Sequence, residues 1–381
     1  MYIIYTGIRT GTNVQTRVNL EMRLVTKLAM CWMMIALPVL AQSKAVISPA
    51  SSGLLNPHAA VFSPATGKVY VVDSARGVVN VSDDEANSTV AVKVGGEPVS
   101  IAVNTANGKA YVANAGDGTV SILDGRTDRV VATLRAGVHP YSIAVNSVTG
   151  KVYVSHTFSE LLTIIDGATD RSTSIRAGSF DLIAVNSRTN TIYLLGYEGG
   201  NLAALDGESE GITQSSIGMH AWGLLVDENS DVVYAGKTGD AEIAVLKGKS
   251  GSPVKVRAGN IPGAIAFNPL TNTLYTANYG DDSVTVIDGE KRMARGSVSV
   301  GSRPEAIAVD PGSNLIFVAN THDNTVTVID GVTNKVRGTL PAGKNPYALA
   351  FNPKSGKLHV GNVDSTSFTI IDVKRMTQGQ Q

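Results

Sequence analysis

The chain has 381 residues and carries 32 basic and 32 acidic side chains, so its formal net charge is zero. Its single cysteine excludes an internal disulfide framework, and the balanced charge does not favour nucleic acid as a partner. Only 6% of the residues are aromatic, which leaves few platforms on which bases could stack.

The N-terminal 41 residues predict an export signal. Arg23 and Lys27 precede an apolar run in MRLVTKLAMCWMMIALPVLA, residues 22–41, which ends with small residues at signal-peptidase positions. We predict that translation starts at Met22, that cleavage follows Ala41, and that the mature protein is periplasmic or secreted. A retained anchor is the alternative, although the run is short for a membrane-spanning helix. The mature chain would have 28 basic and 31 acidic side chains, no cysteine and no membrane span.

The rest of the chain is built from one repeated unit. An aromatic residue, replaced once by histidine, recurs every 40 to 42 residues: Tyr70, Tyr111, Tyr153, Tyr193, Tyr234, Tyr275, Phe317 and His359. Thirteen residues after each of them comes a hairpin residue: Asp83, Asp124, Asp166, Asp206, Lys247, Asp288, Asp330 and Asp372. A fixed period with slippage only in the connections indicates a repeated supersecondary unit.

Each unit has the pattern of four short strands. In the second unit these are VSIAVN (99–104), KAYVAN (109–114), TVSILD (119–124) and RVVATL (129–134), separated by Asn, Gly and Asp turns. One such sheet cannot bury both faces, so the units must stack around a ring. We therefore predict an all-β β-propeller of four-stranded antiparallel blades, eight in number, with seven as the alternative.

The eighth unit supplies only three strands. The segment AVISP, residues 45–49, precedes the first unit at the offset of a fourth strand, and we predict that it closes the ring and removes its open edges. The predicted organisation is an export signal (1–41), a single propeller domain (42–376) and a polar tail (377–381).

The repeated motifs carry a family resemblance. IAVN at 101–104, YVAN at 111–114 and TVTVIDG at 325–331 resemble the YVTN-type β-propeller repeats, whose members include YncE-like periplasmic proteins. The resemblance covers about residues 55–373 and implies a propeller, commonly of seven blades. It carries little information on function, because the motif residues belong to the framework.

Function is expected where the repeats differ, at loops that lie around one mouth of the central channel. These are the loops that enter the first strand and those that follow the second strand of each unit. They contain most of the histidines and Trp222, and they give the candidate ligand-binding residues His58, Glu97, His139, Tyr141, His156, His220, Trp222, Lys237, Arg303, Glu305 and Tyr347.

Structural explanations compete with several of these candidates. We expect Asn114, Asn278, Asn320 and Asn362, which end second strands, to bond their own backbone. The hairpin aspartates are expected to form turns on the opposite face. Glu97, His139 and His156 could form a three-ligand metal site, but no metal-binding spacing supports it, so we predict neither a metal nor a cofactor.

Two functions follow. The first is an exported, non-catalytic and monomeric binding propeller, whose variable face binds a protein, peptide, glycan or small molecule. The second is a lactonase-like propeller hydrolase or lyase, in which Glu97, His139, His156, His220 and Arg303 would be the parts; fold analogy alone suggests it. An enzyme requires convergent side chains with perturbed pKa values, whereas a binding protein requires only a shaped surface.

Overall fold

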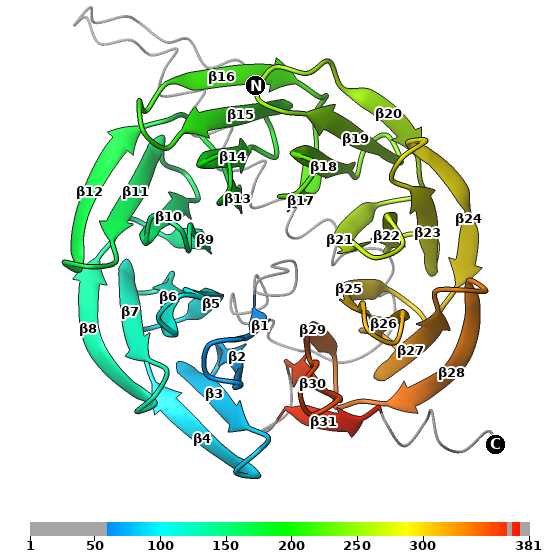
Figure 1. The fold of residues 1–381 in the computed structure, drawn as a ribbon, viewed down its shortest axis with the longest axis horizontal. Helices are drawn as coiled ribbons and strands as arrows, with labels where there is room; N and C mark the ends of the chain where they lie inside the picture. The colour runs from blue at the N-terminus through cyan, green and yellow to red at the C-terminus, as the bar shows by residue number, and fades with distance from the viewer. Residues whose placement is uncertain (1–58, 364–367, 374–381) are drawn as a thin grey trace, which may run out of the picture. The chain divides into compact units, whose positions relative to one another are not determined.

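The structure of this protein is a computed structural model, which describes residues 59–363 and 368–373. The chain divides into two units, Met1–Ser52 and Gly53–Gln381, and every described residue belongs to the second. These residues form strands and turns but no helix, so the described part of the chain contains no helix that could cross a membrane. The strands form eight antiparallel sheets arranged around a central axis (Figure 1).

Each sheet is a blade whose strands follow one another in sequence order. The first four blades are made of β1 (Ala60–Phe62), β2 (Val69–Asp73), β3 (Val78–Asp83) and β4 (Ser88–Lys93); β5 (Pro98–Val103), β6 (Lys109–Asn114), β7 (Thr119–Asp124) and β8 (Arg129–Arg135); β9 (Pro140–Val145), β10 (Lys151–His156), β11 (Leu161–Asp166) and β12 (Arg171–Arg176); β13 (Leu182–Asn186), β14 (Thr191–Leu195), β15 (Asn201–Asp206) and β16 (Ile212–Ser216).

The second half of the ring repeats this plan. Its blades are made of β17 (Ala221–Asp227), β18 (Val232–Lys237), β19 (Glu242–Lys247) and β20 (Val254–Arg257); β21 (Pro262–Asn268), β22 (Thr273–Asn278), β23 (Ser283–Asp288) and β24 (Met293–Ser299); β25 (Pro304–Asp310), β26 (Leu315–Asn320), β27 (Thr325–Asp330) and β28 (Lys335–Pro341); β29 (Pro346–Asn352), β30 (Lys357–Asn362) and β31 (Thr369–Asp372).

The propeller prediction is confirmed, with eight blades rather than seven. The four strands predicted for the second unit agree with β5 to β8 to within one residue at each end. The eighth blade has three strands among the described residues. The segment 45–49 that was predicted to complete it lies outside the described residues, as does the predicted export signal.

Burial differs between the inner and outer strands of a blade. The first strand of each blade lies innermost and the fourth outermost (Figure 1). The second strand, such as β6, is buried almost throughout, because neighbouring blades cover both of its faces. The outermost strand β8 is alternately half-buried and exposed, as expected for a strand with one covered face. The hydrophobic core therefore lies between blades.

The hairpin aspartates form turns, as predicted. Asp124 Oδ1 accepts hydrogen bonds from the backbone nitrogens of Arg126 and Thr127, at 2.8 and 3.3 Å. Asp166 and Asp330 make the same two contacts in their own blades. These carboxylates are occupied by their own turns, which is the behaviour of Asx-turn residues.

Neighbouring blades are matched by a pair of residues at each junction. The pair consists of the repeat aromatic residue of one blade and the residue that follows the hairpin position of the next blade. At six junctions the pair is tyrosine with glycine, from Tyr70 with Gly125 to Tyr275 with Gly331. A Cβ atom added at Gly125 would lie 2.6 Å from the Tyr70 hydroxyl, and one at Gly167 would lie 2.8 Å from that of Tyr111. At these two junctions a side chain in place of glycine would clash with the tyrosine hydroxyl.

The two remaining junctions carry different pairs. Phe317 of the seventh blade is matched with Val373 in the eighth, and both are buried in one apolar cluster. His359 of the eighth blade is matched with Asp84 in the first. Each departure from tyrosine is thus accompanied by a departure from glycine, which leaves room for the larger side chain.

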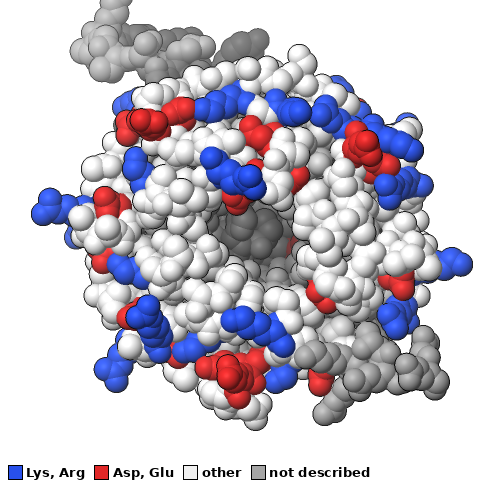
Figure 2. All heavy atoms as spheres, viewed as in Figure 1, with Lys and Arg blue, Asp and Glu red and all other residues white. Residues whose placement is uncertain are grey.

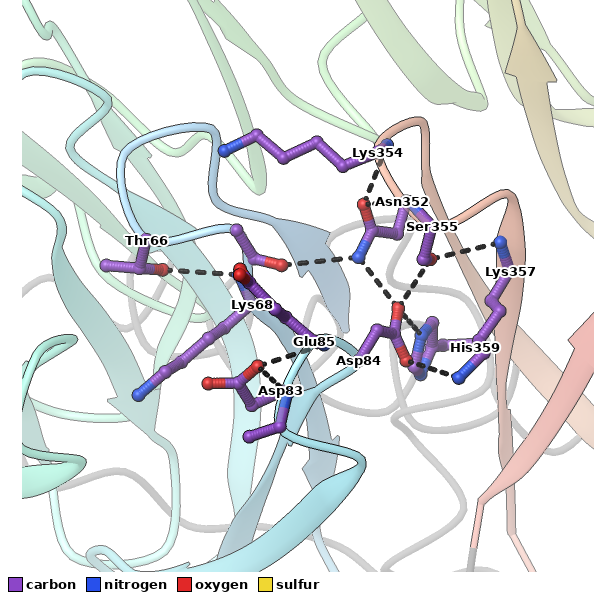
Figure 3. A network of polar contacts seen from close by, with 12 residues as sticks. Thr66, Lys68, Asp83, Asp84, Glu85, Asn352, Lys354, Ser355, Lys357 and His359 are labelled. Carbon is purple, nitrogen blue, oxygen red and sulfur yellow. Dashed lines mark hydrogen bonds and ion pairs between the residues drawn. The ribbon is translucent and has the colours of Figure 1, made fainter.

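The junction that closes the ring is a buried polar network (Figure 3). Asp84 Oδ2 lies 3.0 Å from His359 Nε2 and accepts hydrogen bonds from Ser355 Oγ and Asn352 Nδ2, both at 2.7 Å. Burial raises the pKa of Asp84, but these hydrogen bonds outweigh burial and hold its pKa below the usual value. Burial lowers the pKa of His359. At neutral pH the network therefore pairs a carboxylate with a neutral imidazole that donates through Nε2.

Candidate functional site

The connections that enter the innermost strands share one backbone conformation. The residue before the strand is left-handed in six blades, with φ between 46° and 58°: Glu97, His139, His220, Ile261, Arg303 and Asn345. Its carbonyl accepts a hydrogen bond from the residue after the second strand, as Ile261 does from Tyr279 at 3.0 Å. The two loop sets predicted to lie on one face are therefore directly bonded to each other.

The side chains at these six positions are not those that the backbone favours. Left-handed backbone is tolerated best by glycine and asparagine, and it costs other residues roughly 1 kcal/mol or more. Left-handed turns elsewhere in the described chain mostly use Asn or Asp, as at Asn272 and Asp128. Only Asn345 follows this rule at the entrance, whereas Ile261 is β-branched and the most strained of the set. The fold explains the backbone but not the choice of side chains.

The second residue of the innermost strand is displaced by a β-bulge. The strand register shifts at this point in six blades, for example between Pro98 and Ser100 and between Pro304 and Ala306. A bulge leaves one residue without a cross-strand partner and turns its side chain. The residues at this point include the sequence-predicted Tyr141, Trp222, Glu305 and Tyr347. These four candidate residues therefore occupy the same bulged position in their blades.

Aromatic side chains from three blades meet at one side of the channel mouth. Tyr197 packs against His220 and Trp222, with ring centroids 5.3 Å apart in both cases, and Tyr141 lies 6.3 Å from Trp222. Tyr141 and Tyr197 are buried, while His220 and Trp222 remain half-exposed. We call these four residues the aromatic cluster.

Sequence reasoning missed Tyr197 in this cluster. It lies in the turn after β14, where the fourth unit departs from the YVAN pattern, and that departure was the available signal. Exposed apolar side chains continue the surface beside the cluster: Val138, Phe158 and Met219 are 67%, 44% and 56% exposed. The Phe158 ring meets His139 edge-on, with centroids 6.3 Å apart. Blades 3 to 5 thus provide a surface of aromatic and apolar groups.

A polar cluster lies at the mouth over blades 6 to 8. Thr321 Oγ1 lies 2.8 Å from Glu305 Oε2, and the Arg303 guanidinium lies over the Tyr279 ring, 5.7 Å from its centroid. Glu305 is half-buried, and burial raises the pKa of its carboxyl to about 8, although Arg303, and Thr321 when it donates to the carboxylate, act in the opposite direction. Among the acidic side chains that the structure describes, Glu305 is the one whose pKa is raised. We therefore treat the polar cluster as the second part of the site.

The residues that end the second strands point into the blade. Asn114 Nδ2 donates to Thr119 Oγ1 and Ser121 Oγ, both at 3.0 Å. Asn278 and Asn320 repeat this arrangement, and Asn362 donates to Thr369 and to a backbone carbonyl. The expectation that these asparagines bond their own backbone is therefore wrong for the first three. They join the second strand to hydroxyl groups on the third.

His156 and Lys237 occupy this same inward position. His156 Nε2 lies 2.9 Å from Thr163 Oγ1 and Nδ1 lies 3.1 Å from the Val138 carbonyl, and burial lowers the pKa of the imidazole. Lys237 Nζ bonds Glu242 at 3.1 Å and also Asp240. Burial opposes the charge of Lys237, but these carboxylates raise the pKa of its amine. Both side chains are 1% exposed and have partners within their own blade.

The structure does not assemble the metal-site candidate. Glu97 and His139 are exposed on the entrance connections, whereas His156 is turned into its blade. Among the described residues there is no group of three or more His, Cys, Asp or Glu side chains that could hold a metal. His58 lies outside the described residues.

The remaining candidate, Tyr347, is held at the closing junction. Its hydroxyl donates to the Val72 carbonyl of the first blade, and burial raises the pKa of the phenol. The side chain is half-buried on β29, which lies beside β25, the strand that carries Glu305.

The channel itself is an apolar cavity of about 700 Å³. Its wall is made by the innermost strands of all eight blades, and loops that follow these strands add Thr105, Ser147, Arg188 and Glu228 at the end away from the entrance connections. Figure 2 shows a central hollow in one face of the ring, where acidic and basic side chains are interspersed around the hollow rather than gathered in one patch. That face therefore has no single basic surface.

Fold and channel together define an eight-bladed β-propeller with a variable channel mouth. No protein-family model matches the chain, and no curated protein matches it by sequence. Solved structures that share the fold include the following two. One is the dihydro-heme d1 dehydrogenase NirN in complex with DHE, with a TM-score of 0.71 and 14% identity over 82% of this chain and 72% of that one. The other is hydrazine synthase from Kuenenia stuttgartiensis, with a TM-score of 0.56 and 14% identity over 86% of this chain and 99% of that one. At this identity the likeness is one of fold.

Proposed function

We propose that this protein is a non-catalytic binding propeller whose channel mouth binds a small ligand that contains a flat conjugated ring. The observation that carries the proposal is the entrance connection. Six blades repeat one left-handed backbone, yet only one of them uses a side chain suited to it. Residues that cost stability and that the fold does not require are typical of functional positions.

The aromatic cluster suggests the chemistry of the ligand. Aromatic rings favour stacked or edge-on contacts with other flat rings, and the polar ends of Tyr and Trp orient a bound molecule. Trp222 and His220 are half-exposed, so part of the cluster faces the mouth. The neighbour NirN is described in complex with DHE, which makes a conjugated macrocycle a reasonable probe of this class.

Trp222 provides the test. The chain has two tryptophans, and replacing Trp32 with phenylalanine leaves Trp222 as the reporter. We expect saturable quenching of its fluorescence by hemin, metal-free protoporphyrin or 2-naphthoate, and at least about tenfold weaker binding after Tyr141→Ala or Tyr197→Ala. Leu270→Ala, at an exposed residue in the loop after β21, is the matched control. Absence of saturable quenching with all three probes, or equal binding by every variant, would contradict the proposal.

One observation favours the second candidate, a lactonase-like hydrolase or lyase. Glu305 has a pKa near neutrality at the mouth, as a general acid or base would need. Turnover of a panel of lactones that is lost in Glu305→Gln but kept in Leu270→Ala would favour this function over binding alone.

We further propose that the protein is a monomer that is exported through residues 1–41, and that its repeats place it with the YVTN-type propellers. The basic and apolar sequence of residues 22–41 supports export. Expression in a bacterium, followed by fractionation and N-terminal sequencing, tests this proposal. A mature protein that begins at Gln42 in the periplasm or medium is expected, and an uncleaved cytoplasmic protein would contradict it.

A further inference from the structure

Thr321 makes two oxygen–oxygen contacts that cannot both be hydrogen bonds if Glu305 is ionised. The Thr321 Oγ1 atom lies 2.8 Å from Glu305 Oε2 and also 2.8 Å from the carbonyl oxygen of Pro346. Two oxygens at this distance need a proton between them. A carbonyl only accepts, a carboxylate only accepts, and a threonine hydroxyl has a single proton to donate. One of the two contacts would therefore be repulsive.

A protonated Glu305 satisfies both contacts. Its hydroxyl donates to Thr321 Oγ1, and Thr321 then donates its own proton to the Pro346 carbonyl. The resulting chain runs from the seventh blade to the start of β29 in the eighth. The desolvation of the half-buried carboxyl acts in the same direction and raises its pKa.

We propose that Glu305 is an uncharged carboxylic acid at neutral pH, and that loss of its proton in mildly alkaline solution switches the channel mouth against anionic ligands. The inference rests on the proposed function, since it makes Glu305 the residue that sets the charge preference of the same mouth. A negative charge that appears in half-buried surroundings repels a neighbouring anion more strongly than it would in water. An uncharged ligand should be affected much less.

The titratable and charged groups around Glu305 come from three blades. The sixth blade contributes Tyr279 and Asp282, the seventh contributes Arg303 and the exposed His322, and the eighth contributes Tyr347. Burial raises the pKa of both Tyr279 and Tyr347, so these phenols keep their protons.

The proton itself can be observed without a ligand. Infrared spectra of the full chain, recorded as a difference between wild type and Glu305→Gln, should show a protonated carboxyl band at pH 7 that disappears with a midpoint near pH 8. Thr321→Val removes the acceptor of the protonated carboxyl and should lower this midpoint, whereas Thr321→Ser, which keeps the hydroxyl, should leave it unchanged. A difference spectrum that shows only a carboxylate at pH 7 would overturn the proposal.

Paired probes test the consequence for binding. We expect 2-naphthoate, an anion throughout this range, to bind at least about tenfold more weakly at pH 9.5 than at pH 7, while 2-naphthalenemethanol, which has no charge, binds equally at both. Glu305→Gln should remove the pH dependence. An unchanged pH dependence in Glu305→Gln would overturn the switch. If neither probe binds, the proposed function fails, and the infrared measurement still decides whether Glu305 holds the proton.

Discussion

The pair at the closing junction predicts a strong coupling between His359 and Asp84. Replacing His359 with tyrosine would bring a phenol toward Asp84, and at the equivalent junction a Cβ atom would lie only 2.6 Å from the tyrosine hydroxyl. Replacing Asp84 with glycine would leave the imidazole N–H and the donors on Asn352 and Ser355 without their acceptor. A buried donor that loses its acceptor costs about 1–3 kcal/mol.

The double variant should recover much of this loss. His359→Tyr combined with Asp84→Gly recreates the tyrosine and glycine pair that six other junctions use. We therefore expect the double variant to be destabilised by about 2 kcal/mol less than the sum of the two single destabilisations, within the range seen for residues in contact. Tyr70→His with Gly125→Asp is the reciprocal cycle at an ordinary junction.

Urea unfolding followed by circular dichroism measures all four proteins of the cycle. Single-variant losses that add to within about 0.5 kcal/mol in the double variant would refute the matching rule. The pH dependence gives a second readout. Because burial depresses the pKa of His359, its neutral form stabilises the fold above the unfolded pKa of about 6.5, and this stability is lost as the pH falls. The double variant should lose less stability between pH 7 and 5.

Three further predictions concern the mouth and the blades. The pKa of Glu305 is raised to about 8, so the folded state keeps a proton that the unfolded chain loses near pH 4.5. The free energy of unfolding should therefore fall as the pH rises from 5 to 8, and Glu305→Gln should flatten this slope in urea titrations. Ile261→Asn should raise the free energy of unfolding by up to about 1 kcal/mol, because asparagine suits left-handed backbone; a loss of stability would show that Ile261 is not strained. His156→Asn should cost less than about 1 kcal/mol, because asparagine serves this position in other blades, whereas His156→Ala should cost about 1–3 kcal/mol by leaving Thr163 without its partner; equal losses in thermal melts would contradict this role.

The repeat period predicted the fold because the blade cores depend on local alternation. Each unit repeats its turn residues and its buried strands, so the strand boundaries of β5 to β8 could be read from one copy. The match between His359 and Asp84 was present in the sequence as two simultaneous departures from the repeat. It could not be understood there, because the residues are 275 positions apart and meet only when the ring closes.

Sequence reasoning reached the shared position of several candidate residues but not their orientation. Repeat position grouped Tyr141, Trp222 and Glu305, and a bulge recurs at this point in most blades. Repeat position could not tell which side chains turn inward, and His156 and Lys237 point into their blades, as the asparagines of other units do. The proton on Glu305 depends on the position of Thr321 relative to Pro346, which is a three-dimensional relation between two blades.

The bulge on the innermost strand has a consequence for how this mouth could change over time. A bulged residue has no cross-strand partner, so its replacement leaves the ladder of hydrogen bonds in its blade intact. The eighth blade carries Tyr347 at this position and the seventh blade carries Glu305, yet both blades have the same strand pairing and the same bulge. A gene built of such units could acquire a new ligand by single substitutions, one blade at a time, and the same positions offer an engineer a ring of nearly independent choices.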